Sequence, residues 1–338
     1  MTSPAPLEIL WLSDGKPGHY SLSEAIIAAL SRKRSTSTTR VEVTRPLWLP
    51  PRLLSTITNI RPALVPRLLG LDFARIPTPA VIVSAGGDTL AANVAAARHF
   101  AVPNVFYGSL RRYRPEDFAL VLTSYAEHDE SAPGGRPNTV MTLKPSPRDP
   151  DQLPMPPRDE GTPLSIGVLI GGDSGTIHYD TADWDRLIAL VSEASAAPLR
   201  LTVANSRRTP VHMSDRLACL ATRGAIAFID VRTAGPGTLG PLFAGSHAVV
   251  ATVDSSSMIS EAVWARRPVV VLTPAQWSLP ALEQKYRQDM ERQGWTASLP
   301  LADATPAKIA TTIRTLSPLT TNPLDDLSNL IERRLKLP

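Results

Sequence analysis

The sequence predicts an α/β protein of two Rossmann-like domains that face each other across a cleft, each a parallel sheet with helices on both faces. Short apolar runs alternate with amphipathic stretches, which is typical of parallel strands buried on both sides. A proline-rich, charged connector from about Pro145 to Pro163 interrupts this alternation, which then restarts. At 338 residues, the chain is also longer than most single cores.

In the first half, the expected strands are LEILWL, VEVTRP, AVIVSAG, NVFYG and FALVLTS, with helices that include SLSEAIIAALSRK and TLAANVAAARHF. In the second half, the expected strands are LSIGVLIGG, LRLTVANS, AIAFID, HAVVATV and PVVVL. The helices between them are TADWDRLIALVSEASA, HMSDRLACLATR and SMISEAVWARR. We therefore expect one domain over residues 1–150 and a second over residues 163–315.

The composition is that of an ordinary soluble protein, with 20% charged and 43% hydrophobic residues. No apolar run approaches the ~20 residues that span a bilayer, and we expect no secretory signal. The net charge of +4 suits anionic small molecules or an anionic membrane surface and is too diffuse to indicate nucleic acid. The single cysteine, Cys219, rules out an internal disulfide, and we expect it to be a buried hydrophobe in a reducing cytoplasm.

Two strand ends in the second half carry residues suited to a nucleotide diphosphate. LSIGVLIGGDSGTIHYD ends a strand with Gly171 and Gly172, which let backbone amides approach an anion closely; a simple turn is the alternative. LRLTVANSRRTP ends the next strand with two arginines beside two hydroxyls, a group able to grip a diphosphate: Ser206, Arg207, Arg208 and Thr209. The alternative is a solvated helix start in which both arginines face water.

A third loop, in HAVVATVDSSSMISEAVWARRPVVVL, joins a strand end to a helix start. It carries Asp254, Ser255, Ser256 and Ser257, whose hydroxyls and backbone amides form an anion site at a helix N-terminus. Glu261 follows about one turn later, where its carboxylate is able to receive both hydroxyls of a ribose; the alternative is a glutamate that stabilises the helix dipole. Because all three loops come from one half of the chain, we expect a nucleotide-diphosphate site there.

Several of these motifs together resemble one known family. DGKPGH, SAGGDTLAANVAA, the LIGG loop, NSRRTP and TVDSSSMISEA are similar to motifs of the mitochondrial-fission "elongated mitochondria" family of proposed glycosyltransferases and its bacterial relatives, from about Leu7 to Leu272. The resemblance implies a two-domain GT-B architecture that uses nucleotide-sugar donors. It links the bacterial members to surface-glycan and lipopolysaccharide assembly. The role of plant members in mitochondrial division is not carried over to this chain.

The resemblance also implies roles for the donor loops. Residues 206–209 would meet the donor's phosphates, residues 255–257 would cap them, and Glu261 would hold the ribose. The N-terminal domain would bind the acceptor. A terminal helix within residues 316–338, amphipathic in NPLDDLSNLIERRLKLP, would return to that domain.

In such enzymes the first strand of the N-terminal domain ends in a glycine-rich turn, here LSDGKPGHY. Gly15 and Gly18 would allow close backbone approach, and Lys16 would contact an anionic acceptor or the diphosphate. We expect His19 to act as general base on an acceptor hydroxyl, since its ordinary pKa is near neutrality. Asp14 is the competing base. A capping or solvated histidine is the alternative for His19.

Asp88, at the neighbouring strand end in SAGGDTL, ranks third as a catalytic base. Gly87 and Asp88 stand where the family's pattern suggests a basic pair. We expect no cofactor and no metal, because cationic side chains and a helix N-terminus stabilise the leaving diphosphate. The DxD matches, DPD and DWD, do not lie at strand ends, and the His/Cys spacing offers no zinc site.

Residues 46–77 are rich in Leu, Pro and Arg and poor in acids, so this segment is a candidate for peripheral contact with an anionic membrane. The apolar residues at helical spacing are Leu53, Ile57, Ile60, Leu64 and Leu68. The alternative is that this stripe packs on its own sheet. Pro62 and Pro66 interrupt a helix in either case.

The leading hypothesis is a cytoplasmic glycosyltransferase, at the inner face of the cytoplasmic membrane, that moves a sugar from a nucleotide donor to a glycan or lipid-linked, lipopolysaccharide-type acceptor. A nucleotide-sugar epimerase of similar shape is the first alternative. It would need acid/base groups around the sugar, and the second half offers only His178 and His212 near suitable loops. A non-catalytic nucleotide-binding scaffold is the second alternative.

Overall fold

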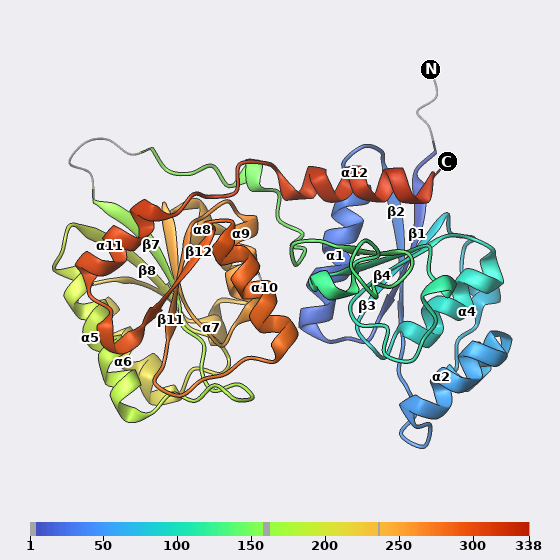
Figure 1. Cartoon of the computed structure of the whole chain (residues 1–338), viewed down its shortest axis with the longest axis horizontal. Helices are drawn as coiled ribbons and strands as arrows, with labels where there is room; N and C mark the ends of the chain where they lie inside the picture. Colours follow the sequence, from blue (N-terminus) through green and yellow to red (C-terminus); the bar gives the residue numbers. More distant parts are fainter. Residues whose placement is uncertain (1–4, 158–162, 236, 338) are drawn as a thin grey trace. The chain divides into compact units, whose positions relative to one another are not determined.

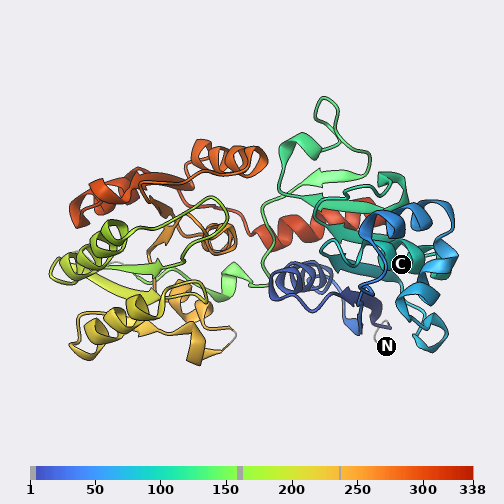
Figure 2. The ribbon, with the colours of Figure 1, turned by 90° about the horizontal axis from the view of Figure 1, so that it is seen from below.

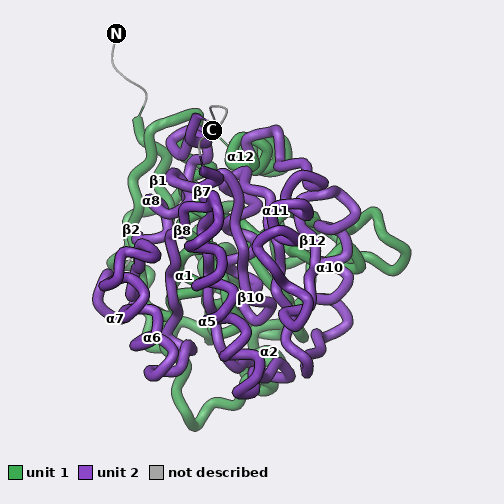
Figure 3. Tube along the Cα trace, turned by 90° about the vertical axis from the view of Figure 1, so that its left-hand side faces the viewer, with its two compact units in different colours: residues 1–147, 323–338 green, residues 148–322 purple. Residues whose placement is uncertain are grey.

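The computed structural model describes residues 5–157, 163–235 and 237–337. The chain forms two compact units, one of Met1–Pro147 with Pro323–Pro338 and one of Arg148–Asn322 (Figure 3). Each unit holds a six-stranded sheet whose neighbouring strands run parallel. Helices cover both faces of each sheet (Figure 1). The predicted α/β class with two Rossmann-like domains is confirmed. Part of the predicted connector, residues 158–162, lies outside the described residues.

The sheet of the first unit has the strand order β2-β1-β3-β4-β5-β6. Its strands are β1 (Leu7–Ser13), β2 (Thr36–Glu42), β3 (Val81–Ala85), β4 (Asn104–Tyr107), β5 (Leu120–Thr123) and β6 (Thr139–Met141). Its helices are α1 (Pro17–Leu30), α2 (Pro51–Ile60), α3 (Val65–Leu69), α4 (Leu90–Phe100) and α12 (Pro323–Leu335). The expected strand VEVTRP begins earlier in the structure, because β2 is an edge strand whose half-exposed threonines need no apolar run.

Alternate residues of β1 face two different cores. Leu10 and Leu12 point into a cluster with buried residues of α2, α3 and α4. The other face of the sheet is covered by α1, against which α12 packs (Figure 1). Arg32 at the end of α1 forms an ion pair of 2.7 Å with Asp325 of α12, and Arg34 pairs with Glu332 at 2.8 Å.

The sheet of the second unit has the order β12-β11-β10-β7-β8-β9. Figure 2 shows the helices around its strands, seen from below. Its strands are β7 (Leu164–Leu169), β8 (Leu199–Ala204), β9 (Ala227–Ile229), β10 (Ala248–Thr252), β11 (Val269–Thr273) and β12 (Thr296–Pro300). Its helices are α5 (Thr181–Ser195), α6 (Val211–Thr222), α7 (Val231–Ala234), α8 (Leu239–Ala244), α9 (Ser256–Trp264), α10 (Ala281–Arg292) and α11 (Pro306–Thr315).

The expectation that Cys219 is buried is wrong, because its side chain is exposed. It lies on α6, whose inward face is formed by Met213, Ser214 and Leu217. At ~100° per residue, a position two residues after Leu217 points away from that face. A small apolar residue can occupy the solvent side of a helix, so composition alone did not decide its burial.

Candidate functional site

Both sheets have a point where the strand order reverses. In the first unit β1 lies between β2 and β3, and in the second β7 lies between β8 and β10. In open parallel sheets, ligands bind beyond the carboxyl ends of the strands at such a point. The predicted residues gather there, since residues 14–19 follow β1, residues 86–88 follow β3, residues 171–172 follow β7 and residues 254–257 follow β10.

His19 and Asp14 form a close pair at the end of β1. The Nδ1 atom of His19 lies 2.8 Å from Oδ2 of Asp14. The Asp14 side chain is 3% exposed and the His19 side chain 35% exposed, so the carboxylate is covered while part of the imidazole reaches solvent. When the carboxylate accepts a hydrogen bond from Nδ1–H, the other ring nitrogen, Nε2, carries the lone pair that a general base needs.

The backbone around this pair depends on two glycines. Gly15 has a φ of +72°, and its amide donates to the Ser13 hydroxyl over 3.1 Å. Gly86, at the end of β3, has a φ of +93°, and a Cβ there would overlap Nδ1 of His19. Gly18 lies in the first turn of α1, with open space where a Cβ would stand. The approach of β3 to the imidazole therefore requires glycine at position 86.

Lys16 links this turn to Asp88, with its Nζ 2.7 Å from Oδ2 of Asp88 and 3.5 Å from Oδ2 of Asp14. The hydrogen bond from Lys16, with the charges of Lys16, Arg45 and Arg111, lowers the pKa of the Asp88 carboxyl against the opposing effect of burial. The same hydrogen bond raises the pKa of Lys16. A carboxylate with a lowered pKa is a weak base, which favours His19 over Asp88 as the proton acceptor.

In the second unit, Asp254 is the centre of a hydrogen-bond network. Its side chain has no exposed area, and Oδ2 accepts from the Gly172 amide over 3.1 Å and from Arg208 over 2.5 Å. Oδ1 accepts from the Tyr179 hydroxyl over 3.2 Å. A Cβ at Gly171 would overlap this carboxylate. Asp254 therefore holds the loop after β7 in place. The expected contact of Asp254 with a nucleotide-sugar donor stays a prediction.

The loop after β8 is tied to the same strand end. The Thr209 hydroxyl is buried and lies 2.9 Å from the carbonyl of Ile170 and 2.7 Å from that of Gly171, so it holds β7 and this loop together. The Ser206 hydroxyl accepts from the Arg208 amide over 3.1 Å. Since a Cβ at Gly172 would overlap the Arg208 carbonyl, the two loops pack backbone against backbone.

The exposed groups of this region carry positive charge or donate hydrogen bonds. Arg207 is exposed, and the Arg208 side chain keeps 43% of its area accessible despite its pairing with Asp254. The α9 helix begins beside them, with Ser255 as its N-cap accepting from the Met258 amide over 3.4 Å. Ser256 is half-buried and Ser257 is exposed. Amides at a helix start, next to two guanidinium groups, can bind a phosphate or diphosphate.

Glu261 lies on α9, half-buried, with Oε2 3.8 Å from Nε of Arg148. Burial raises the pKa of its carboxyl, and the Arg148 charge opposes this shift. A carboxylate held away from water suits hydrogen bonds from the hydroxyls of a ligand, because each donated bond replaces lost hydration.

Four residues at these strand ends were not identified from the sequence. Tyr179 and Arg148 contact Asp254 and Glu261 from other loops. Arg45 lies 3.7 Å from Asp88, and Arg111 packs against Gly87, where a Cβ would overlap its guanidinium. For Arg111 a signal was present, because LRRYR follows the strand NVFYG as directly as NSRRTP follows its own strand.

Within residues 5–157, 163–235 and 237–337, no three His, Cys, Asp or Glu side chains are grouped so as to hold a metal ion. The predicted independence from metal and cofactor stays a prediction.

Solved structures of the same overall architecture span almost the whole chain. MurG of Acinetobacter baumannii has a TM-score of 0.50 at 12% identity, covering 97% of this chain and 100% of its own. The glycotransferase of kitacinnamycin has a TM-score of 0.54 at 12% identity, covering 98% and 100%. The UDP-GlcNAc 2-epimerase of Neisseria meningitidis, bound to UDP-GlcNAc, has a TM-score of 0.53 at 10% identity, covering 98% and 100%. At these identities the likeness shows the fold alone.

Two Rossmann-like domains with this likeness define a GT-B-like fold. Over residues 17–332 the sequence matches the family described as Mitochondrial fission ELM1, and the chain belongs to that family. The resemblance inferred from its motifs is thereby confirmed. The sequence matches no protein of curated function.

Proposed function

We propose that this protein is a glycosyltransferase that moves a sugar from a nucleotide-sugar donor to a hydroxyl of a glycan or lipid-linked acceptor. The observation that carries the proposal is the cationic, amide-rich strand end of the second unit, where Arg207, Arg208 and the start of α9 converge at the β7/β10 reversal. In support, the Neisseria meningitidis epimerase of the same fold was solved with UDP-GlcNAc bound. Glu261 would accept hydrogen bonds from the ribose hydroxyls.

The chemistry divides between the two units. His19 accepts the proton of the acceptor hydroxyl on Nε2, and Asp14 stabilises the resulting imidazolium. The acceptor oxygen forms a bond to the anomeric carbon while the bond from that carbon to the diphosphate oxygen breaks. The nucleoside diphosphate leaves with the bonding electrons. Its charge is stabilised by Arg207, Arg208 and the α9 amides, so we propose that transfer needs no metal.

We further propose that the acceptor is lipid-linked, of the lipopolysaccharide type, and that the protein touches the membrane surface through residues 46–77. Five large apolar side chains of this segment are exposed: Leu47 at 98%, Trp48 at 67%, Leu53 at 48%, Ile60 at 68% and Leu64 at 46%. Of the predicted stripe, Leu53, Ile60 and Leu64 are exposed, and Leu68 is partly buried against the core. The residues of this segment that pack fully into the core are others, such as Leu54 and Val65. No helix in the described part of the chain has the length and apolarity to cross a bilayer.

A nucleotide panel tests the donor site. We expect UDP, GDP or CMP to raise the unfolding temperature of the wild-type protein, because a ligand of the native state stabilises it by mass action. Arg207→Ala should abolish this shift without lowering the unfolding temperature of the ligand-free protein, since Arg207 is exposed. If no nucleotide shifts the wild-type protein, the donor site is wrong, and what remains is a non-catalytic scaffold that has lost its nucleotide site. Transfer that is abolished by EDTA and restored by magnesium or manganese would contradict metal independence.

A nucleotide-sugar epimerase is the second candidate, favoured by the fold shared with UDP-GlcNAc 2-epimerases. Its acid/base groups would come from the second unit, where His178 is exposed and lies 3.3 Å from Asp173, and His212 is exposed. Incubation with UDP-GlcNAc and no acceptor separates the two reactions. A changed sugar on an intact nucleotide would support the epimerase, whereas release of UDP that requires an acceptor supports transfer.

A further inference from the structure

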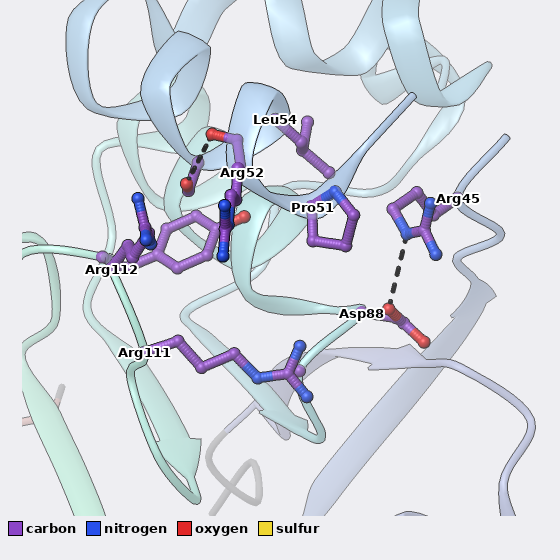
Figure 4. Close-up of a pocket in the computed structure, with 10 residues that line it drawn as sticks. Arg45, Pro51, Arg52, Leu54, Asp88, Arg111 and Arg112 are labelled. Carbon is purple, nitrogen blue, oxygen red and sulfur yellow. Dashed lines mark hydrogen bonds and ion pairs between the residues drawn. The ribbon is translucent and has the colours of Figure 1, made fainter. Parts of the chain in front are cut away.

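A second basic site lies in the first unit, at the carboxyl ends of β2, β3 and β4. Here a pocket of about 110 Å³ is lined by Arg45, Arg52, Arg111 and Arg112, together with Asp88 and Tyr113 (Figure 4). One water molecule needs ~10–15 Å³ of such space, so the pocket has room for a phosphate or diphosphate group.

The pocket has an excess of positive charge. Asp88 is its only acidic lining residue among the described residues, and its carboxylate is already engaged by Lys16 at 2.7 Å. In the described part of the chain, Arg52, Arg111 and Arg112 form no ion pair with a carboxylate, and all three are exposed at the rim. Clustered guanidinium groups that outnumber the carboxylates beside them repel one another and favour the binding of an anion.

Three structural details direct these groups into the pocket. Nε of Arg45 is buried, donates no hydrogen bond to any described residue and lies 3.7 Å from Oδ1 of Asp88. Arg111 adopts a left-handed backbone with a φ of +54°, and its guanidinium lies on Gly87, where only the absence of a side chain makes room. Figure 4 shows the side chains of Arg45 and Arg111 approaching Asp88 from different sides. The amide of Asn59 fixes the Arg112 carbonyl over 3.0 Å.

Apolar side chains flank the same pocket. The segment that connects Arg45 to Arg52 carries Leu47 and Trp48, which are 98% and 67% exposed, and Leu53 follows at 48%. A cationic pocket beside exposed apolar side chains matches an amphiphile whose anionic head is joined to a hydrocarbon chain.

We propose that this pocket binds the phosphate or diphosphate group of a lipid-linked acceptor, with Leu47 and Trp48 against the lipid. This inference rests on the proposed transferase function. Asp88 links the pocket to residues 14–19 after β1, because Lys16 contacts both Asp88 and Asp14. An acceptor anchored by its phosphate would thereby be held next to His19.

The soluble part of the ligand is tested with inorganic pyrophosphate and the full-length protein. Binding is followed by the fluorescence of Trp48. This is the part of the protein's tryptophan emission that is absent in Trp48→Phe. We expect Arg111→Ala to weaken binding about 10- to 100-fold, the effect of losing charge-assisted hydrogen bonds. Gly87→Ala should act in the same direction, since its Cβ displaces the Arg111 guanidinium without removing a charge. Arg114→Ala, an exposed arginine of the same loop outside the pocket, is the matched control.

The lipid is tested by flotation with two kinds of phosphatidylcholine vesicle. One contains polyprenyl diphosphate, and the other contains enough phosphatidylglycerol to carry the same negative charge. We expect tighter binding to the polyprenyl diphosphate vesicles, lost in Arg111→Ala and reduced in Trp48→Ser. Equal binding to both vesicles would overturn the lipid-linked acceptor in favour of a general anionic surface. Pyrophosphate binding that is unchanged in both Arg111→Ala and Gly87→Ala would overturn the pocket itself.

A separate readout distinguishes failure of this inference from failure of the proposed function. The thermal shift by UDP reports on the second unit, so Arg111→Ala should retain it. If the wild-type protein shows no nucleotide shift but binds pyrophosphate, the transferase proposal is overturned and the anion pocket is retained. A nucleotide shift without pyrophosphate binding at Trp48 would do the reverse.

Discussion

Oδ2 of Asp14 lies 2.8 Å from Nδ1 of His19, and the carboxylate is almost fully covered while the imidazole is part-exposed. This arrangement orients a base whose Nε2 is free for a substrate proton. We expect His19→Ala to lower kcat by ~10²–10⁴-fold, the usual contribution of a general base. Asp14→Asn should lower kcat as well, because the amide favours the wrong tautomer. Single-turnover assays check both variants; unchanged UDP affinity is the control, and an active His19→Ala would make Asp14 the candidate base.

Gly86→Ala tests the same pair without altering a titratable group. A Cβ at this position would overlap the His19 imidazole, so we expect a loss of transfer comparable to that of His19→Ala. The positive φ of 93° adds a backbone cost of ~1–2 kcal/mol. Gly70→Ala is a matched control, because its φ is +67° and nothing lies within 4 Å of its added Cβ. Both variants should lose stability in thermal unfolding through the positive φ, and Gly86→Ala should lose more because of the overlap. Only Gly86→Ala should lose activity.

Asp254→Asn should destabilise the second unit by about 2–4 kcal/mol, since its carboxylate accepts several buried hydrogen bonds. Most of this loss comes from the Gly172 amide and the Tyr179 hydroxyl, because the exposed Arg208 is screened by solvent. Tyr179→Phe removes one of these bonds and should cost ~1 kcal/mol. Chemical denaturation measures both effects. Equal stability of Asp254→Asn and the wild-type protein would show that the loop after β7 is held by other contacts.

The raised pKa of Glu261 predicts a pH dependence with a defined sign. Burial favours the protonated carboxyl in the folded state, so its contribution to stability is greatest below 4.5, the ordinary glutamate value, and declines as the pH rises through the raised pKa. Ribose hydroxyls that donate to the carboxylate need it ionised. The affinity for the nucleotide that the thermal-shift panel selects should therefore increase over the same range. Calorimetric titration against pH checks this, with Glu261→Gln expected to flatten the profile; an identical profile in that variant would exclude Glu261 as the ribose ligand.

Ile331→Ala tests how much the packing of α12 stabilises the first unit. Its side chain has no exposed area, so truncation should cost about 2–5 kcal/mol. Leu330→Ala, at a half-buried neighbouring position, should cost less. Denaturant unfolding measures both, and equal small losses would mean that α12 contributes little to the stability of this unit.

The apolar runs predicted the central strands because a strand that is buried on both faces needs a continuous run of apolar residues. The edge strands β6 and β12 were not predicted, and β2 was placed too late, because an edge is partly exposed and carries no continuous apolar signal. Cys219 illustrates a related limit, since its place on the outer side of α6 follows from helix phase and not from residue type.

The contacts of the candidate site are of two kinds, those within one loop and those between loops. Asp14 and His19 are five residues apart on one turn, so their pairing follows from local geometry. Arg111 meets Gly87, and Arg148 meets Glu261, only because separate loops converge at one sheet edge. That convergence depends on strand order, which the periodicity of apolar residues does not specify. The rule that ligands bind at strand ends predicts which loops matter, but not which side chains meet there.

The placement of α12 has a consequence for biogenesis. The first unit takes its covering helix from residues 323–335, which a ribosome makes only after the whole of the second unit. Until then, the parts of α1 and β5 that α12 contacts have no cover, and exposed apolar surface of this kind is what chaperones bind. The amino-terminal half of the polypeptide therefore matures last, although it is translated first.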